Sequence, residues 1–387
     1  MNGALTGVPY DGTRMSEAEA YIDSLELMGM QFGLERMRAL LDRLGNPEAA
    51  FDAIHVVGSN GKSSTVRFCE ALLEAEGVRS GAYLSPHLTT FRERIRVGGE
   101  TIEPDAYERA VLRVAGAAGE EGVTQFEALT GAGFAAFAEA GVQWAVVEAG
   151  LGGRLDATNV LPRSQVQVLT NIALEHTELL GDSRSKIAVE KLAVVPDGGV
   201  VVMGEDGWEE LVPQASRTIQ VSVGGSFQDQ NRAVARASVE AALGRPVDPA
   251  PMEQVEVPGR LQVRASRPLE IWDGAHNPAG MQRLVAELPA LLGDRQAVAV
   301  FSALEDKDVA SMLTLLREVC PTVVATTSSN PRALPASVIS GMTGGAAAED
   351  PHQALEAARV LAGPRGAVVV CGSLYLLHDL DDGSQPG

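Results

Sequence analysis

The sequence has little cysteine and few aromatic residues. It contains three cysteines and 4% aromatic residues in 387 positions. Cys69, Cys320 and Cys371 lie far apart, and none belongs to a CxxC pair or has the spacing of a Cys/His metal site. This pattern excludes a disulfide scaffold and a zinc site built from paired cysteines. We expect three buried, unreactive thiols in a reducing compartment.

Basic residues and long apolar runs are also scarce. Lys and Arg total 31 against 51 Asp and Glu, giving a formal net charge of -20, which disfavours nonspecific attraction to nucleic acid or anionic lipid. No apolar run approaches the roughly 18 residues that span a bilayer, and the N-terminus lacks a basic stretch followed by an apolar one. We therefore expect a cytoplasmic protein without nucleic-acid or membrane partners, in which local groups hold any anionic ligand.

What is present indicates an ordered protein with two domains. Hydrophobic residues make up 45% of the chain, and 387 residues exceed one ordinary core. Apolar positions at helical spacing predict two helices within 16–44. Beyond them, short apolar runs alternate with helical stretches, which is typical of βα units on a parallel sheet. The expected strands are 53–58, 80–85, 144–150 and 166–172, and the expected helices are 63–77, 126–141 and 186–195.

A proline-rich segment divides the chain. Residues 244–259 hold four prolines and little periodicity, so we expect a boundary or linker there. The alternation then restarts, with expected strands at 269–276, 297–304, 322–329 and 367–373 and helices at 279–292, 307–319 and 351–362. The sequence therefore predicts an α/β fold with a larger parallel-sheet domain and a second, smaller α/β domain.

A phosphate-binding loop is predicted at GSNGKSS, residues 58–64. It follows the strand AIHVV and precedes a helix, the context in which backbone N–H groups and a helix N-terminus bind phosphate. Lys62 would add a positive charge near the outer phosphates. The general pattern GxxxxGK[ST] calls for glycine at position 56, where this chain has Val56, and the alternative is an ordinary strand-to-helix turn.

Polar residues follow three further strands. Ser85, Glu148 and the pair Glu175-His176 come where predicted strands end. Ligands of open parallel sheets sit beyond the carboxyl ends of the strands, so these side chains predict a Mg²⁺-nucleotide site. Taken singly, the residues have structural alternatives: a helix cap for Ser85, a surface acid for Glu148 and a core histidine for His176.

Two arginines are further candidates. Arg154 lies in the glycine-rich stretch 150–159, which we expect to be a loop lining the site. Arg260, in VPGR at the linker, would reach a terminal phosphate when the domains close, and its alternative is a solvated linker charge.

These residues resemble those of the folylpolyglutamate synthase and dihydrofolate synthase family, part of the Mur-type ATP-dependent amide ligases. The resemblance covers nearly the whole chain, and GLGGRLDATN and DGAHNP are its most specific strings. The matching strings, in chain order, are GLERM, GSNGKSS, YLSPHLTTFRERI, TQFEALTGAGFAAF, VVEAGLGGRLDATN, LEHTELLG, IAVEK, PGR, DGAHNP, LEDKD, PRA and GSLYL.

The resemblance implies an N-terminal arm at 1–15, an ATPase domain at 16–250, a linker at 251–260 and a Rossmann-like glutamate-ligase domain at 261–387. It also implies roles for individual residues. The implied ATP-binding residues are Gly58, Asn60, Gly61, Lys62, Ser63, Ser64, Arg260 and Asp273. The implied Mg²⁺ ligands are Ser85, Glu148, His176 and a carbamylated Lys191. The implied substrate residues are His276 and Ser373 near the acyl phosphate and glutamate, Arg154 beside them, and Phe126, Asp156 and Ala157 at the pterin pocket.

The chain departs from the family pattern at several positions. Ser63 replaces a usual glycine, Arg92 an asparagine and Glu175 an aspartate, while Leu192-Ala193 replaces Ala-Gly. The stretch 196–230 is also shorter than relatives carry. None of these departures removes a catalytic atom.

The implied reaction is glutamate ligation driven by ATP. The acid, a folate or dihydropteroate, would attack the γ-phosphorus, and the glutamate amine would displace phosphate from the acyl phosphate, in a monomeric enzyme that uses Mg²⁺. One alternative is a Mur-type ligase with another carboxylate substrate, such as a nucleotide-sugar peptide. The other is a nonenzymatic ATP-binding switch, which leaves DGAHNP unexplained.

Overall fold

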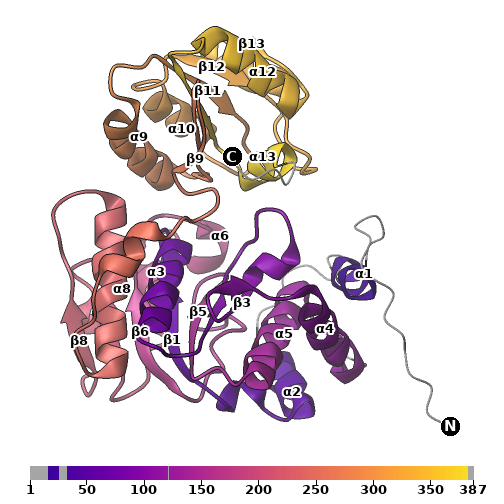
Figure 1. Cartoon of the computed structure of the whole chain (residues 1–387), viewed down its shortest axis with the longest axis vertical. Helices are drawn as coiled ribbons and strands as arrows, with labels where there is room; N and C mark the ends of the chain where they lie inside the picture. The colour runs from indigo at the N-terminus through magenta and orange to yellow at the C-terminus, as the bar shows by residue number, and fades with distance from the viewer. Residues whose placement is uncertain (1–15, 26–32, 121, 382–387) are drawn as a thin grey trace.

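The computed structural model describes residues 16–25, 33–120 and 122–381, so the expected N-terminal arm lies outside the described residues. The described chain forms two α/β lobes joined near residue 260, with the N-terminal lobe below and the C-terminal lobe above in Figure 1. The predicted α/β fold with two unequal sheet domains is confirmed. None of the described helices is both long and apolar enough to cross a bilayer.

The first lobe is built on an eight-stranded sheet. Six consecutive strands run parallel up to one edge, and two short strands at the other edge pair antiparallel. In spatial order the strands are β4 (Glu100–Thr101), β3 (Ile95–Val97), β2 (Ser80–Tyr83), β5 (Trp144–Glu148), β1 (Asp52–Val57), β6 (Ser164–Leu169), β7 (Val200–Met203) and β8 (Arg217–Gln220).

Helices cover both faces of this sheet because its strands are apolar on both faces. Along β5, Val146 packs in the core under α3 and α8, whereas Ala145 and Val147 pack in the core under α5. The helices of the lobe are α1 (Glu17–Ser24), α2 (Glu35–Leu44), α3 (Lys62–Ala75), α4 (Pro104–Ala117), α5 (Gln125–Ala140), α6 (Thr177–Leu180), α7 (Arg184–Leu192) and α8 (Phe227–Leu243). Short 3-10 turns lie at η2 (Pro47–Ala49), η3 (Phe91–Arg94), η4 (Glu209–Leu211) and η5 (Ala250–Gln254).

The second lobe has a six-stranded sheet in which only one edge strand, β9, is antiparallel. In spatial order the strands are β13 (Ala346–Ala347), β12 (Thr322–Ala325), β11 (Ala297–Phe301), β14 (Ala367–Cys371), β10 (Leu269–Trp272) and β9 (Gln262–Ser266). The helices are α9 (Pro278–Leu292), α10 (Val309–Leu316), α11 (Ala336–Thr343), α12 (Pro351–Ala362) and α13 (Leu374–Leu380).

Several predicted elements differ from the observed ones. The strand predicted at 269–276 ends at Trp272, so Asp273 and His276 lie in a loop and not on a strand. The predicted strand 297–304 likewise ends at Phe301. The prediction also left out helices α4, α6, α8, α11 and α13 and strands β3, β4, β7, β8, β9 and β13. The three cysteines are buried and unpaired, as expected.

Candidate functional site

A cavity of about 340 Å³ lies between the lobes, where the carboxyl ends of the two parallel sheets face each other. Parallel sheets bind ligands at this end. The first lobe lines the cavity with the phosphate-binding loop, Ser85, Glu148, Glu175, His176 and Lys191. The second lobe lines it with Arg260, Asp273, His276, Lys307 and Ser373. The structure therefore brings the predicted ATP, metal and glutamate residues to one cleft.

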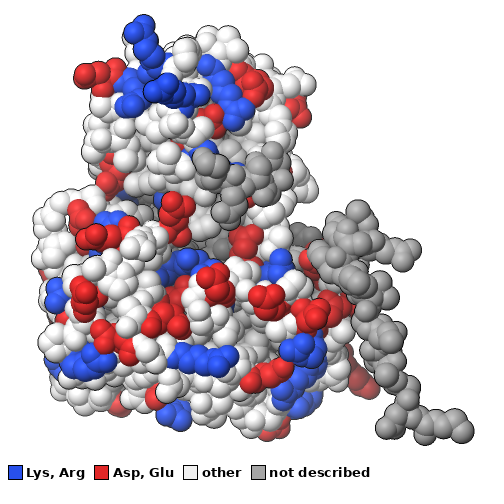
Figure 2. All heavy atoms as spheres, in the orientation of Figure 1, with Lys and Arg blue, Asp and Glu red and all other residues white. Residues whose placement is uncertain are grey.

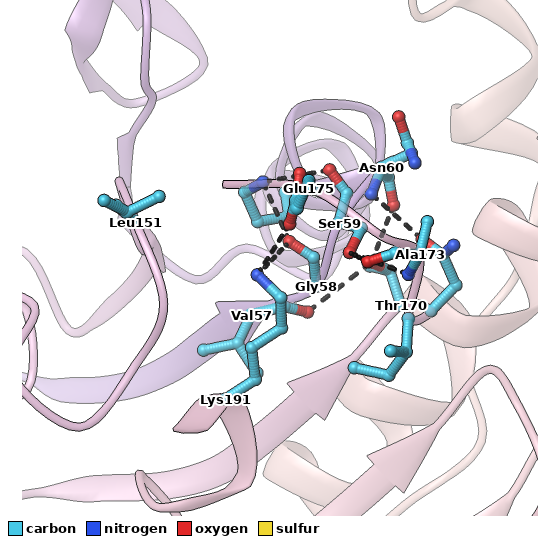
Figure 3. Close-up of polar contacts among 12 residues, drawn as sticks. Val57, Gly58, Ser59, Asn60, Leu151, Thr170, Ala173, Glu175 and Lys191 are labelled. Atoms are coloured by element: carbon cyan, nitrogen blue, oxygen red, sulfur yellow. Dashed lines mark hydrogen bonds and ion pairs between the residues drawn. The ribbon is translucent and has the colours of Figure 1, made fainter. Parts of the chain in front are cut away.

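The phosphate-binding loop is fixed between β1 and the end of β6. A Cβ on Gly58 would lie 1.9 Å from Thr170 Oγ1, so only glycine fits there. The Asn60 N–H donates to Asn171 Oδ1 at 2.9 Å, and the Ala173 N–H donates to Ser59 Oγ at 2.9 Å (Figure 3). Contacts within the protein thus hold the loop in shape.

The Lys62 ammonium lies inside the loop that it would serve. Its Nζ donates to Gly58 O at 3.0 Å and to Ser59 O at 3.5 Å. Lys62 is also the first residue of α3, so the free N–H groups of that helix open onto the same space. A phosphate oxygen can replace these carbonyl acceptors with little movement of the side chain.

The Glu148 carboxylate joins three segments at the centre of the cleft. Oε1 accepts from Ser63 Oγ at 3.1 Å, and Oε2 accepts from the Ser85 N–H at 3.2 Å. Burial raises the pKa of Glu148, while nearby Lys62 opposes that shift. The family's usual glycine at position 63 could not make this contact, so the Ser63 departure adds a hydroxyl to Glu148.

These donors fit a hard divalent cation. No group of three His, Cys, Asp or Glu side chains within the described ranges is arranged to hold a metal alone. Mg²⁺ in nucleotide sites needs only one or two carboxylates, because phosphates and water complete its shell. Glu148, Ser85 and His176 provide a carboxylate, a hydroxyl and an imidazole along one cleft.

Lys191 is buried and paired. Its Nζ lies 2.9 Å from Glu175 Oε1 and donates to Gly58 O at 3.1 Å (Figure 3). Burial lowers the pKa of Lys191, and the Glu175 carboxylate opposes the shift. Burial would raise the pKa of Glu175, but Lys191 and Lys62 outweigh it and the net pKa is lowered. Glu175 is one methylene longer than the family's aspartate, and its carboxylate lies directly beside the lysine.

The loop after β10 presents Asp273 and His276. Asp273 accepts from the Ala275 and Leu261 N–H groups at 2.8 and 2.9 Å, which fixes the loop against the linker. His276 Nδ1 lies 2.8 Å from Gly274 O. Because a carbonyl can only accept, Nδ1 carries the proton and Nε2 carries the lone pair. Burial lowers the pKa of His276 to about 4, so the ring is neutral near pH 7.

Two other residues of this lobe support the cleft. Arg260 lines it, and its Nη1 donates to Gly259 O at 2.9 Å. Ser373 caps α13, with its Oγ accepting from the Tyr375 N–H at 3.2 Å. Arg260 therefore stands at the junction of the lobes, and its action on a terminal phosphate stays a prediction.

The 150–159 loop lines the cleft, but not through Arg154. Leu151 and Gly152 face the cavity, whereas Arg154 is exposed and pairs with Glu190 at 3.2 Å. The prediction that this loop lines the cleft is therefore confirmed, while substrate binding by Arg154, whose side chain is directed to α7, stays a prediction.

The predicted pterin residues lie behind this loop. The Phe126 ring packs 6.1 Å from the Tyr83 ring and leaves no room for a side chain at Gly150. Asp156 accepts from the Leu151 N–H at 2.8 Å and the Thr158 N–H at 3.0 Å, and Ala157 is buried in the core. The structure thus shows how these three residues support the loop, and pterin binding stays a prediction.

Sequence reasoning missed several residues of the cleft. They are Phe227 and Gln228 at the start of α8, Arg283 and Glu287 on α9, and Lys307. The sequence does contain a helix-start pattern for α8, because Ser226 and Asp229 have the spacing of a capping box and form one at its N-terminus. Lys307 lies in the string LEDKD, for which the resemblance implies no role.

Comparison with known proteins gives concordant similarities. Residues 259–374 match the family described as "Mur ligase, glutamate ligase domain". The chain is 35% identical over 367 residues to the dihydrofolate synthase/folylpolyglutamate synthase of Mycobacterium tuberculosis, covering 78% of this chain and 75% of that protein.

Two solved structures are similar along nearly their full length. One is E. coli FolC in complex with DHPP and ADP, with a TM-score of 0.88 and 28% identity over 95% of this chain and 97% of that one. The other is a bifunctional folylpolyglutamate synthase/dihydrofolate synthase with Mn, AMPPNP and L-glutamate bound. It has a TM-score of 0.85 and 28% identity over 95% of this chain and 98% of that one.

Proposed function

The chain belongs to the folylpolyglutamate synthase/dihydrofolate synthase family, and from that premise we propose that it is an ATP-dependent ligase joining L-glutamate to a folate-type acid. The observation that carries this proposal is one cleft shared by two lobes. The phosphate-binding loop and Glu148 approach it from one side, and Arg260, Asp273 and His276 from the other.

The first half-reaction needs charge neutralisation at the phosphates. The acid carboxylate attacks the γ-phosphorus of ATP and ADP leaves, which forms an acyl phosphate. Lys62 exchanges its bonds to Gly58 O and Ser59 O for phosphate oxygens. Glu148, Ser85 and His176 would hold Mg²⁺, which supplies further positive charge when it is bound.

The second half-reaction needs an oriented amine. The glutamate nitrogen attacks the acyl carbon, phosphate leaves, and the amine loses its protons. His276 Nε2 is a hydrogen-bond acceptor at neutral pH because Nδ1–H is committed to Gly274 O. With a pKa near 4, the ring orients an amine N–H but does not retain the proton.

The Lys191 environment supports carbamylation. Its amine must be neutral to attack CO₂, and burial lowers its pKa in that direction. The new N–C bond yields a carbamate and releases a proton, which places two anionic groups beside each other at Glu175 and Lys191. A bound divalent cation would supply positive charge that offsets this repulsion. We infer that carbamylation accompanies metal loading, and that the ion pair with Glu175 is the unmodified state.

A substrate panel tests the proposed function. ADP release is measured with ATP, Mg²⁺ and glutamate against dihydropteroate, a tetrahydrofolate and a nucleotide-sugar peptide precursor. We expect release with one or both pterin acids, dependent on glutamate. Release with the nucleotide-sugar acid alone would favour a Mur-type ligase, and nucleotide binding without any acid-dependent release would favour a binding switch.

A further inference from the structure

Arg283 of the second lobe reaches across to the first lobe. It lies on α9, and its guanidinium carbon is 4.1 Å from the centroid of the Phe227 ring at the start of α8. One turn further along α9, the Glu287 carboxylate accepts a hydrogen bond from the Phe227 backbone N–H. All three residues line the cleft. The two contacts fix the second and third turns of α9 against the beginning of α8.

The Arg283 guanidinium has an unfilled donor. Within the described part of the chain, its Nη1 is buried and has no hydrogen-bond partner. The neighbouring carboxylates do not fill it: Glu287 is engaged with the Phe227 N–H, and Glu175 acts on the guanidinium only through its charge. Buried donors in native proteins are nearly always bonded. A charged donor without an acceptor, in a cleft, indicates that the ligand provides the acceptor.

The position of this donor identifies the ligand's chemistry. Phe227 also covers the phosphate-binding loop, since a Cβ on Gly61 would lie 2.8 Å from Phe227 Cζ. Arg283 therefore stands one aromatic ring away from the loop, on the opposite lobe. A guanidinium there is suited to an oxyanion that extends from the loop toward α9.

We propose that Arg283 is a further nucleotide-binding residue, which donates from Nη1 to a phosphate oxygen within the ADP part of the nucleotide. This inference rests on the proposed function for the presence of a nucleotide, and it adds a contact from the second lobe that the sequence motifs do not contain. Because the contact is made to the part that ATP and ADP share, it acts on nucleotide affinity and not on the chemical steps.

The test compares ADP binding by calorimetry, in Mg²⁺, for wild type and Arg283→Met. Methionine keeps an apolar cover over Phe227 and removes the donors. We expect affinity to fall about tenfold, the effect of one lost hydrogen bond to a charged group, with kcat at saturating ATP nearly unchanged. The Arg283→Lys protein keeps the positive charge, and we expect its ADP affinity to lie between those of wild type and Arg283→Met.

Arg232→Met is the matched control. Arg232 also lies over a phenylalanine, with its guanidinium carbon 5.2 Å from the Phe68 ring centroid, but it is absent from the cleft lining. We expect its ADP affinity to equal that of wild type, and thermal unfolding checks that each variant is folded.

Two outcomes would overturn the inference. One is an Arg283→Met protein that binds ADP as tightly as wild type. The other is a loss of kcat at saturating ATP with unchanged ADP affinity, which would make Arg283 a residue of lobe closure only. Failure of the proposed function looks different, because the wild-type protein would then bind ADP yet join no glutamate to any acid.

Discussion

At the scale of single residues, the cleft depends on buried charges whose partners are specific. Glu148 is the clearest case, because burial raises its pKa while Lys62, Ser85, Ser63 and Arg260 oppose that shift. Burying a carboxylate lowers the stability of the folded protein, so a buried and partly compensated carboxylate in a cleft indicates a functional site.

Glu148→Gln keeps the shape of the side chain and removes its charge. We expect Mn²⁺ binding in the presence of ADP, followed by electron paramagnetic resonance, to be lost together with ligation, because an amide oxygen is a weak substitute for a carboxylate. Glu190→Gln is the control, since Glu190 pairs with exposed Arg154 and is absent from the cleft lining. Near-normal turnover in a folded Glu148→Gln protein would contradict the assignment.

His276→Ala separates binding from chemistry. We expect ADP affinity to stay within about twofold and kcat to fall by about 10²-fold, because the lost acceptor orients the amine and touches no phosphate. With a pKa of about 4, His276 gains its proton only as pH falls through that value. The wild-type rate should therefore show no acid limb from this residue near pH 6.5, and a nucleotide affinity lost in the variant would refute its role.

Lys191→Ala tests the carbamate. We expect ligation to be lost and partly restored by acetate or formate, whose oxygens can occupy the vacated space, and we expect density for an added carboxyl group in crystals grown with bicarbonate. If the plain alanine protein is fully active, Lys191 serves only as the ion-pair partner of Glu175 seen at 2.9 Å.

At the scale of elements, the sequence predicts best what is local. The strand before GSNGKSS and the helix after it follow from apolar spacing, and the observed β1 and α3 agree. Helix α8 was missed because its first turns are polar, with Gln228, Asp229, Gln230 and Asn231 hiding the buried Val234 and Val239. The predicted strand that begins at Leu269 is longer than the observed one. The Asp273 carboxylate accepts hydrogen bonds from the backbone N–H groups of Leu261 and Ala275, which hold the chain in a loop there. The spacing of apolar residues carries no information about these hydrogen bonds.

Contacts between the lobes could not be predicted from the sequence at all. Leu88 follows β2 in the first lobe, yet it is buried in the core of the second lobe with Trp272 and Leu376. His378 Nδ1 donates to Leu88 O at 2.8 Å. Such pairing depends on how two complete lobes dock, and so does the contact of Arg283 with Phe227.

Leu88→Ala should therefore destabilise the second lobe, although the substitution lies in the first. Truncating a buried leucine lowers the free energy of unfolding by about 2–4 kcal/mol. We therefore expect faster hydrogen exchange of the backbone amides in α13, which measures the stability of the second lobe. Leu179→Ala, at an exposed leucine, is the control. Equal protection of α13 in the two variants would show that Leu88 contributes nothing to the second lobe.

At the scale of the whole molecule, the chain is strongly acidic, yet several of its basic side chains lie together in the cleft where anionic ligands are expected. Figure 2 shows acidic and basic side chains intermixed over both lobes, while the cleft gathers Lys62, Lys191, Arg260, Arg283 and Lys307. The net charge of -20 repels anions at a distance, so affinity for a nucleotide has to come from these close contacts. The first lobe carries Lys62 and Lys191 and the second carries Arg260, Arg283 and Lys307, so the positive charge of the cleft is divided between the lobes.

The measurement that tests this account most directly follows oxygen atoms through the reaction. The acid substrate is prepared with its carboxylate oxygens labelled by a heavy isotope, and the released phosphate is analysed by mass spectrometry after turnover with ATP and glutamate. An acyl phosphate intermediate transfers one labelled oxygen from the carboxylate to phosphate, because the acyl C–O bond breaks when the amine attacks. We expect one labelled oxygen in the phosphate for each amide formed. Amide formation with unlabelled phosphate would contradict ligation through an acyl phosphate in this cleft.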